Sequence, residues 1–124
     1  MTRSSDVLTS AALVKLADEF GTPLYVYHAE KIATQYQKLQ KAFSKTNARF
    51  FYACKALTNI NILRLMKQMG AGLDTVSIQE VKLGLRAGFE PQNIIFTPNS
   101  VALDEIIEAK ELGVAAVRGA EGRD

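Results

Sequence analysis

Lys55 is the residue in this sequence whose type and position best suit covalent chemistry. It follows the apolar run Arg49–Cys54, which is too short for a helix and is predicted to form a buried strand ending at Lys55. Parallel α/β proteins place their active sites at the carboxyl ends of their strands. An amine held there against apolar walls loses solvation of its charged form, so the neutral amine can attack a carbonyl and form an imine. On pattern alone, a charged residue that simply ends a strand is still the favoured interpretation.

Three further polar residues belong to the next strand and the helix that follows it. Asp74 starts the predicted strand Leu73–Val76, and its short side chain suits the glycine-containing turn before it. Neighbouring parallel strands bring their active edges together, so Asp74 can lie near Lys55. Ser77 and Glu80 have the spacing of a capping box, which explains their side chains better than chemistry does. The helix N-terminus beneath them is a plausible anion site.

The other reactive side chains favour structural roles. His28 is the only histidine and lies at a strand-to-helix junction, where it can cap a helix or contact solvent. No second metal-type ligand lies near it, so no metal site is expected. Cys54 precedes Lys55 in a predicted strand, so the two side chains should point to opposite faces and Cys54 should be core. Neither a phosphate loop nor the three-glycine dinucleotide fingerprint occurs.

The elements that must position these residues alternate between two periods of hydrophobicity. Starts of predicted strands near Phe50, Leu73, Ile94 and Val114 recur every 20 to 23 residues, and the helices between them close with glycine. This repeat indicates an α/β fold with parallel strands joined by right-handed crossovers. An open doubly wound sheet and part of a (β/α)₈ barrel are the alternatives. A barrel typically needs about 250 residues, so this chain supplies roughly half.

Helices are predicted over 9–20, 29–43, 59–69, 77–88 and 102–112, and an earlier strand over 24–27.

Composition and charge exclude several classes of protein. The 124 residues are 48% apolar and 23% charged, as in ordinary soluble proteins, and a net charge of +2 is too weak to indicate nucleic acid. A single cysteine allows no internal disulfide. No apolar run approaches the roughly 20 residues of a membrane helix, and the first residues lack the apolar region of a signal peptide. We therefore expect a soluble cytoplasmic protein with no nucleic-acid or membrane partner.

Four motifs occur in order along the chain. They are Gly21-Thr-Pro-Leu-Tyr-Val-Tyr27, Phe51-Tyr-Ala-Cys-Lys-Ala56, Gly70-Ala-Gly-Leu-Asp-Thr-Val-Ser77 with Glu80, and Ala87-Gly88 followed by Ile94-Ile-Phe-Thr97. In order and spacing they resemble the N-terminal part of the pyridoxal-phosphate decarboxylases of the ornithine, diaminopimelate and arginine group, which have an alanine-racemase-like barrel (fold type III). The match runs from about Phe20 to Val114, and it reverses the interpretation of Lys55.

The resemblance implies pyridoxal 5'-phosphate as the cofactor and assigns roles to the candidate residues. Lys55 takes the position of the lysine that bonds covalently to the cofactor, and Asp74 that of the aspartate beside it. Ser77 and Glu80 match the family's Ser-x-x-Glu, which opens the next helix and supports the site. The family usually has aspartate where this chain has His28, a departure with little bearing on the chemistry.

The resemblance also implies a domain organisation. Residues 29–114 correspond to the N-terminal part of a (β/α)₈ TIM-type barrel, incomplete at about half. Residues 1–28 supply a helix and a strand of the family's second, β-rich domain. Residues 115–124 lose the strand pattern, and with two glycines and four charges in the last seven positions they are expected to be a divergent or frayed tail.

The implied activity is decarboxylation of a small amino-acid substrate, with a homodimer in the full-length family. The opening motif at 21–27 favours the branch that converts meso-diaminopimelate to lysine and CO₂, the last step of lysine synthesis. A carboxynorspermidine, ornithine or arginine decarboxylase is an alternative, as is a non-catalytic pyridoxal-phosphate carrier or a half-barrel that needs a partner. The family's cofactor-stacking histidine, phosphate loop and substrate-reading arginine lie downstream, so this polypeptide alone is expected to be an inactive N-terminal fragment.

Overall fold

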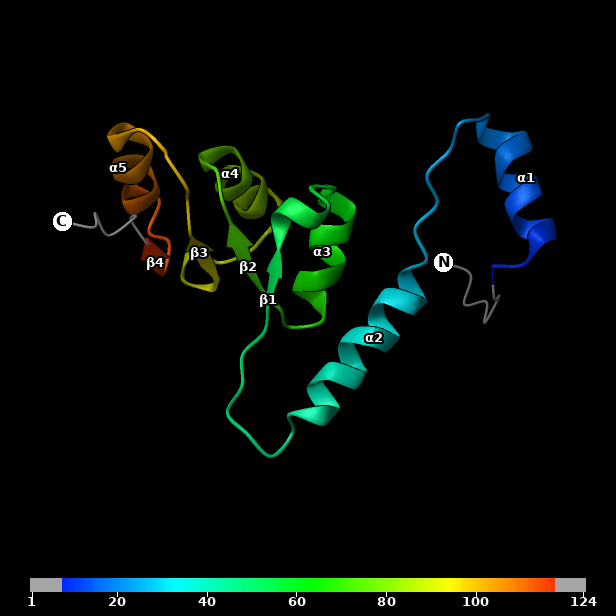
Figure 1. Ribbon diagram of the computed structural model, residues 1–124, viewed down its shortest axis with the longest axis horizontal. Coiled ribbons are helices and arrows are strands. Elements are labelled where there is room, and N and C mark those ends of the chain that lie inside the picture. Colours follow the sequence, from blue (N-terminus) through cyan, green and yellow to red (C-terminus); the bar gives the residue numbers. More distant parts are fainter. Residues whose placement is uncertain (1–7, 118–124) are drawn as a thin grey trace.

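The computed structural model describes residues 8–117 of the chain. Helices and strands alternate from residue 51 onward, as the sequence predicts (Figure 1). The helices are α1 (Ser10–Phe20), α2 (Ala29–Ala42), α3 (Ile60–Gln68), α4 (Ile78–Ala87) and α5 (Leu103–Glu111), with single 3₁₀ turns η1 (Cys54–Ala56) and η2 (Pro91–Asn93). The strands are β1 (Phe51–Ala53), β2 (Gly72–Thr75), β3 (Ile94–Phe96) and β4 (Ala116–Val117).

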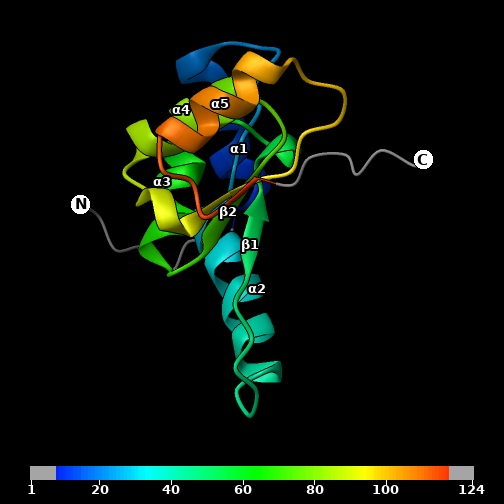
Figure 2. The ribbon, with the colours of Figure 1, turned by 90° about the vertical axis from the view of Figure 1, so that its left-hand side faces the viewer.

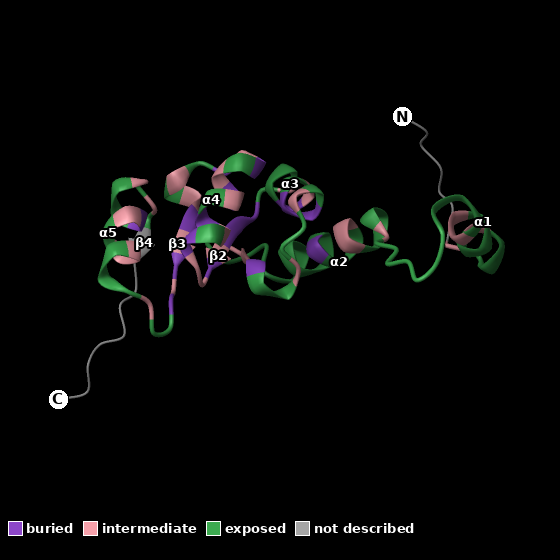
Figure 3. Ribbon diagram, turned by 90° about the horizontal axis from the view of Figure 1, so that it is seen from above, coloured by how far each residue is buried: buried purple, intermediate pink, exposed green. Residues whose placement is uncertain are grey.

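The four strands form one open parallel sheet in the order β1-β2-β3-β4. Ala53 lies opposite Asp74, and Asp74 lies opposite Ile95, so the carboxyl ends of β1, β2 and β3 meet at one edge. The helices α3, α4 and α5 lie on one side of the strands (Figure 3). A doubly wound sheet carries helices on both faces, whereas a barrel wall carries them only outside. The arrangement therefore matches part of a barrel wall, and the α/β prediction is confirmed.

The core lies between the sheet and these helices. Leu73 of β2 is completely buried and packs against α4 at Gly84, where a Cβ atom would lie 2.4 Å from Leu73 Cδ2. This close approach explains the glycine. Thr75 is the buried polar residue of β2, and its hydroxyl donates a hydrogen bond to the Ile95 carbonyl at 2.8 Å, which offsets the cost of its burial. The other large, fully buried side chains are Leu63, Val81, Ile94 and Phe96.

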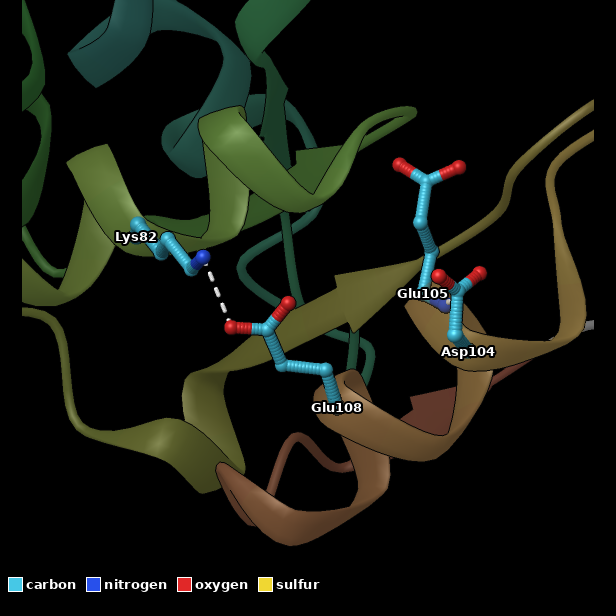
Figure 4. A network of polar contacts seen from close by, with 4 residues as sticks. All are labelled: Lys82, Asp104, Glu105 and Glu108. Carbon is cyan, nitrogen blue, oxygen red and sulfur yellow. Dashed lines mark hydrogen bonds and ion pairs between the residues drawn. The ribbon is translucent and has the colours of Figure 1, made fainter.

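Two polar contacts at the surface involve the last helix, α5. Lys82 of α4 and Glu108 of α5 form an ion pair, with 2.7 Å between Nζ and Oε1 (Figure 4). Glu105, in the first turn of α5, accepts a hydrogen bond from the Ala102 N–H at 3.4 Å. Both partners of the ion pair are about half exposed, so its contribution to stability is small.

The segment before the sheet differs in part from the prediction. The helix predicted from residue 9 forms as α1, with the Thr9 hydroxyl accepting from the Ala12 N–H at 3.2 Å. The strand predicted over 24–27 is wrong. No strand in the described part of the chain offers that segment a hydrogen-bonding partner, and Tyr25 remains 86% exposed. Figure 1 shows α1 standing apart from the other helices, at the far end of this segment.

Helix α2 meets the sheet through aromatic residues. Figures 1 and 2 show its carboxyl end reaching past the start of β1. Phe50, just before β1, stacks edge-on against Tyr36 and Phe43, with ring centroids 6.2 and 5.6 Å apart. These contacts attach α2 to the amino end of the sheet, away from the carboxyl edge.

The last described residues add a short strand to the sheet. The fourth strand starts at Ala116, two residues later than Val114, and pairs with β3. The segment predicted to be a divergent tail thus contains β4 at its beginning, and residues 118–124 lie outside the described part. No helix within residues 8–117 has the length and hydrophobicity needed to cross a membrane.

Truncation of the buried Leu73 tests this core. We expect Leu73→Ala to lower the free energy of unfolding by about 2–5 kcal/mol, because the lost side chain leaves a cavity against α4. Leu103→Ala removes the same atoms from a residue that is 71% exposed and should cost less than about 0.5 kcal/mol. Urea unfolding of both variants provides the measurement, and equal losses would contradict the described packing.

Candidate active site

Lys55 lies at the carboxyl end of β1, but not within the strand. β1 ends at Ala53, and the chain then makes the 3₁₀ turn η1, which the Leu57 N–H closes by donating to the Cys54 carbonyl at 3.1 Å. Cys54 is buried and Lys55 is exposed. The sequence predicts this contrast from strand alternation, whereas the tight turn produces it. The exposure of Lys55 also means that apolar walls do not enclose the side chain, in contrast to the expectation from sequence.

Asp74 lies inside β2, where Thr97 fixes its carboxylate. The hydroxyl of Thr97, directly after β3, donates to Asp74 Oδ1 at 2.8 Å. The Thr97 N–H donates to the Thr75 carbonyl at 2.8 Å, which continues the pairing of β2 and β3 beyond the assigned strand. Asp74 is therefore a residue of the sheet rather than of the preceding turn. Asp74 pairs with Ala53, and Lys55 follows Ala53 by two residues in the chain.

Ser77 and Glu80 begin α4 with a modified capping box. The Ser77 hydroxyl accepts from the Glu80 N–H at 3.2 Å, as predicted. The Glu80 carboxylate accepts from the Val76 N–H at 2.8 Å, one residue earlier than the capping box requires. Both side chains are thus held at the junction between β2 and α4.

The pKa of the Cys54 thiol reflects two of these carboxylates. Burial, and then the nearby carboxylates of Glu80 and Asp74, raise the pKa of Cys54 to about 11. Residues from the end of β1, from β2 and from the start of α4 therefore share one electrostatic environment. The neutral thiol adds no charge there at physiological pH. The carboxyl edge of the sheet thus carries an exposed primary amine after β1, and carboxylates fixed by hydrogen bonds in β2 and at the start of α4.

His28 does not belong to this site. It caps α2, its Nδ1 accepting from the Lys31 N–H at 3.1 Å. Within residues 8–117, no group of three His, Cys, Asp or Glu side chains could hold a metal ion.

A cavity of about 240 Å³ lies at the other edge of the sheet. Phe50 and Gly72, which line it, stand at the amino ends of β1 and β2, so the cavity is separate from Lys55 and Asp74. Arg49 also lines it, donates to Asn93 Oδ1 at 2.8 Å and lies over the Phe51 ring. The guanidinium of Arg49 is thus engaged by neighbouring residues of the chain, which gives Arg49 a structural role in the wall of the cavity.

The sequence of this chain is similar to that of a known family of proteins. The family model for the pyridoxal-dependent decarboxylase, pyridoxal binding domain, matches residues 29–120. Diaminopimelate decarboxylase of Methanothermobacter thermautotrophicus is 44% identical over 110 residues, which cover 87% of this chain and 26% of that protein. The Escherichia coli K12 enzyme of the same name is 36% identical over 116 residues, 90% of this chain and 26% of the relative.

Solved structures agree with the sequence comparison. The crystal structure of Helicobacter pylori diaminopimelate decarboxylase complexed with L-lysine superposes with a TM-score of 0.79 and 31% identity, over 85% of this chain and 27% of that one. The chain thus spans about a quarter of the length of the relatives it matches.

The raised pKa of Cys54 gives a test of the environment around the thiol. The folded state keeps the thiol proton up to about pH 11, whereas the unfolded chain loses it near the ordinary value of 9.0, so stability should fall as the pH rises between these values. We expect this loss to reach about 2–3 kcal/mol more in the wild type than in Cys54→Ala. Urea unfolding at several pH values measures it. Parallel pH curves for the two proteins would contradict the burial of Cys54 near Asp74 and Glu80.

Proposed function

The chain belongs to the pyridoxal-dependent decarboxylase family, and on that premise we propose that Lys55 is the covalent anchor for pyridoxal 5'-phosphate. The observation that carries the proposal is the place of Lys55, in the η1 turn that follows β1, at the same carboxyl edge of the parallel sheet to which β2 brings Asp74. The donor set fits the cofactor, because an exposed primary amine can reach an aldehyde and a fixed carboxylate can stabilise a cationic group next to it. When bound, the cofactor supplies an electron-accepting ring.

The residues around Lys55 have distinct tasks in this proposal. The η1 turn holds the backbone of Lys55 at the strand end, so the flexible part is the side chain alone. Asp74 provides a carboxylate of fixed orientation. Ser77 and Glu80 hold the start of α4 against β2, where the helix N-terminus favours an anionic group. Together, Lys55, Asp74, Ser77 and Glu80 would hold the cofactor.

We propose decarboxylation of meso-diaminopimelate to lysine as the reaction of the protein to which this segment corresponds. The support is the 44% identity to a diaminopimelate decarboxylase and the opening motif at 21–27. A related substrate is the second candidate, because lysine/ornithine decarboxylase from Vibrio vulnificus has the same local fold at 26% identity and a TM-score of 0.78.

Trapping of the cofactor tests the role of Lys55. After addition of pyridoxal phosphate and reduction with borohydride, we expect peptide mapping to find the label predominantly on Lys55. Lys55→Ala should reduce the label to the background of the other lysines, whereas Lys110→Ala, which removes an exposed lysine from α5, should leave it unchanged. Labelling spread evenly over surface lysines in the wild type would contradict the proposal.

The 124-residue polypeptide itself should not turn over the substrate. Lys55 is exposed at an open sheet, so water reaches the reacting groups, and the single histidine of the sequence is already engaged as the cap of α2. We expect release of CO₂ from meso-diaminopimelate to stay at the level of free pyridoxal phosphate. Saturable release above that level, lost in Lys55→Ala, would overturn this expectation.

A further inference from the structure

We propose that Thr97 is a positioning residue, which orients the Asp74 carboxylate so that its second oxygen serves a cationic group at the end of β1. The proposal rests on the function proposed above, because that function supplies the cationic group. The sequence motif contains Thr97 without giving it a role, and the structure gives its hydroxyl a specific partner.

The geometry leaves one carboxylate oxygen committed and the other available. Thr97 Oγ1 donates to Asp74 Oδ1 at 2.8 Å, and within residues 8–117 no side chain or N–H donates to Oδ2. A hydroxyl bonded to a charged oxygen makes a stronger hydrogen bond than one between neutral groups. Since Asp74 and Thr97 are both partly buried, solvent competes less for this bond than it would at the surface.

Thr97 can hold Asp74 in place because Thr97 is itself held. Its N–H is bonded to the Thr75 carbonyl at 2.8 Å, and its hydroxyl lies 3.4 Å from the same carbonyl. Thr75 in turn is fully buried and donates to Ile95 at 2.8 Å. The bonds connect β2 and β3 in both directions, so the hydroxyl has a fixed location relative to the backbone of Asp74.

The test compares one variant that lacks the hydroxyl of Thr97 with one that keeps it. Thr97→Val keeps the branched shape and removes the donor, whereas Thr97→Ser keeps the donor. The first readout needs no cofactor: the ¹³C signal of the Asp74 carboxylate in aspartate-labelled protein, assigned with Asp74→Asn. We expect Thr97→Val to shift this signal and Thr97→Ser to leave it near its wild-type position.

The second readout is the rate of borohydride-trapped labelling of Lys55 by pyridoxal phosphate. Thr97→Val should slow labelling roughly tenfold, the effect expected when one charged hydrogen bond that orients the carboxylate is lost, and Thr97→Ser should restore it. Thr46→Val is the control, because it removes a hydroxyl that donates to the Phe43 carbonyl far from the sheet edge. If Thr97→Val does not fold, Thr97→Ala takes its place.

The outcomes separate the two proposals. A wild-type Asp74 signal in Thr97→Val, or equal effects of Thr97→Ser and Thr97→Val, would overturn the role of Thr97. A shifted signal with unchanged labelling would show a bond that is structural only, which also overturns it. Absence of specific Lys55 labelling in the wild type would instead refute the proposed function, while the carbon signal still reports on Thr97.

Discussion

The register of the parallel strands is the constraint on which the rest of the structure depends. Ala53 opposite Asp74, and Asp74 opposite Ile95, set the carboxyl ends of three strands at one edge. A shift of one residue would turn Asp74 toward the helices and bring a core side chain to the site. The buried core opposes such a shift, because Leu73, the residue before Asp74, packs against α4 at Gly84.

Apart from Asp74, which lies within β2, the residues of the proposed site stand just beyond the strands. Lys55 follows β1 in the η1 turn, Thr97 follows β3, and Ser77 begins α4 after β2. The sheet fixes the backbone at such positions. Because these residues lie outside the strands, their side chains do not have to alternate between the two faces of the sheet. This combination suits the role proposed for Lys55, which needs a rigid backbone and an accessible amine.

The sequence predicts the regular elements well because each depends on local pattern. Helix α4 shows its cap, apolar stripe and closing Gly88, and β3 lies where Ile94–Phe96 is predicted. The strand expected over 24–27 depends on a partner strand, which a local pattern cannot reveal. The bond between Thr97 and Asp74 joins residues 23 positions apart, and the available signal was only that Thr97 directly follows an apolar strand.

Cross-linking by a carbodiimide, which joins an amine directly to a carboxylate, tests the central claim that Lys55 and Asp74 share one sheet edge. The surface ion pair of Lys82 and Glu108 is an internal reference that must react (Figure 4). Mass spectrometry of the digested protein should find a Lys55–Asp74 peptide together with the reference link. The account would be contradicted if the reference link forms but Lys55 is joined only to carboxylates on the outer helices.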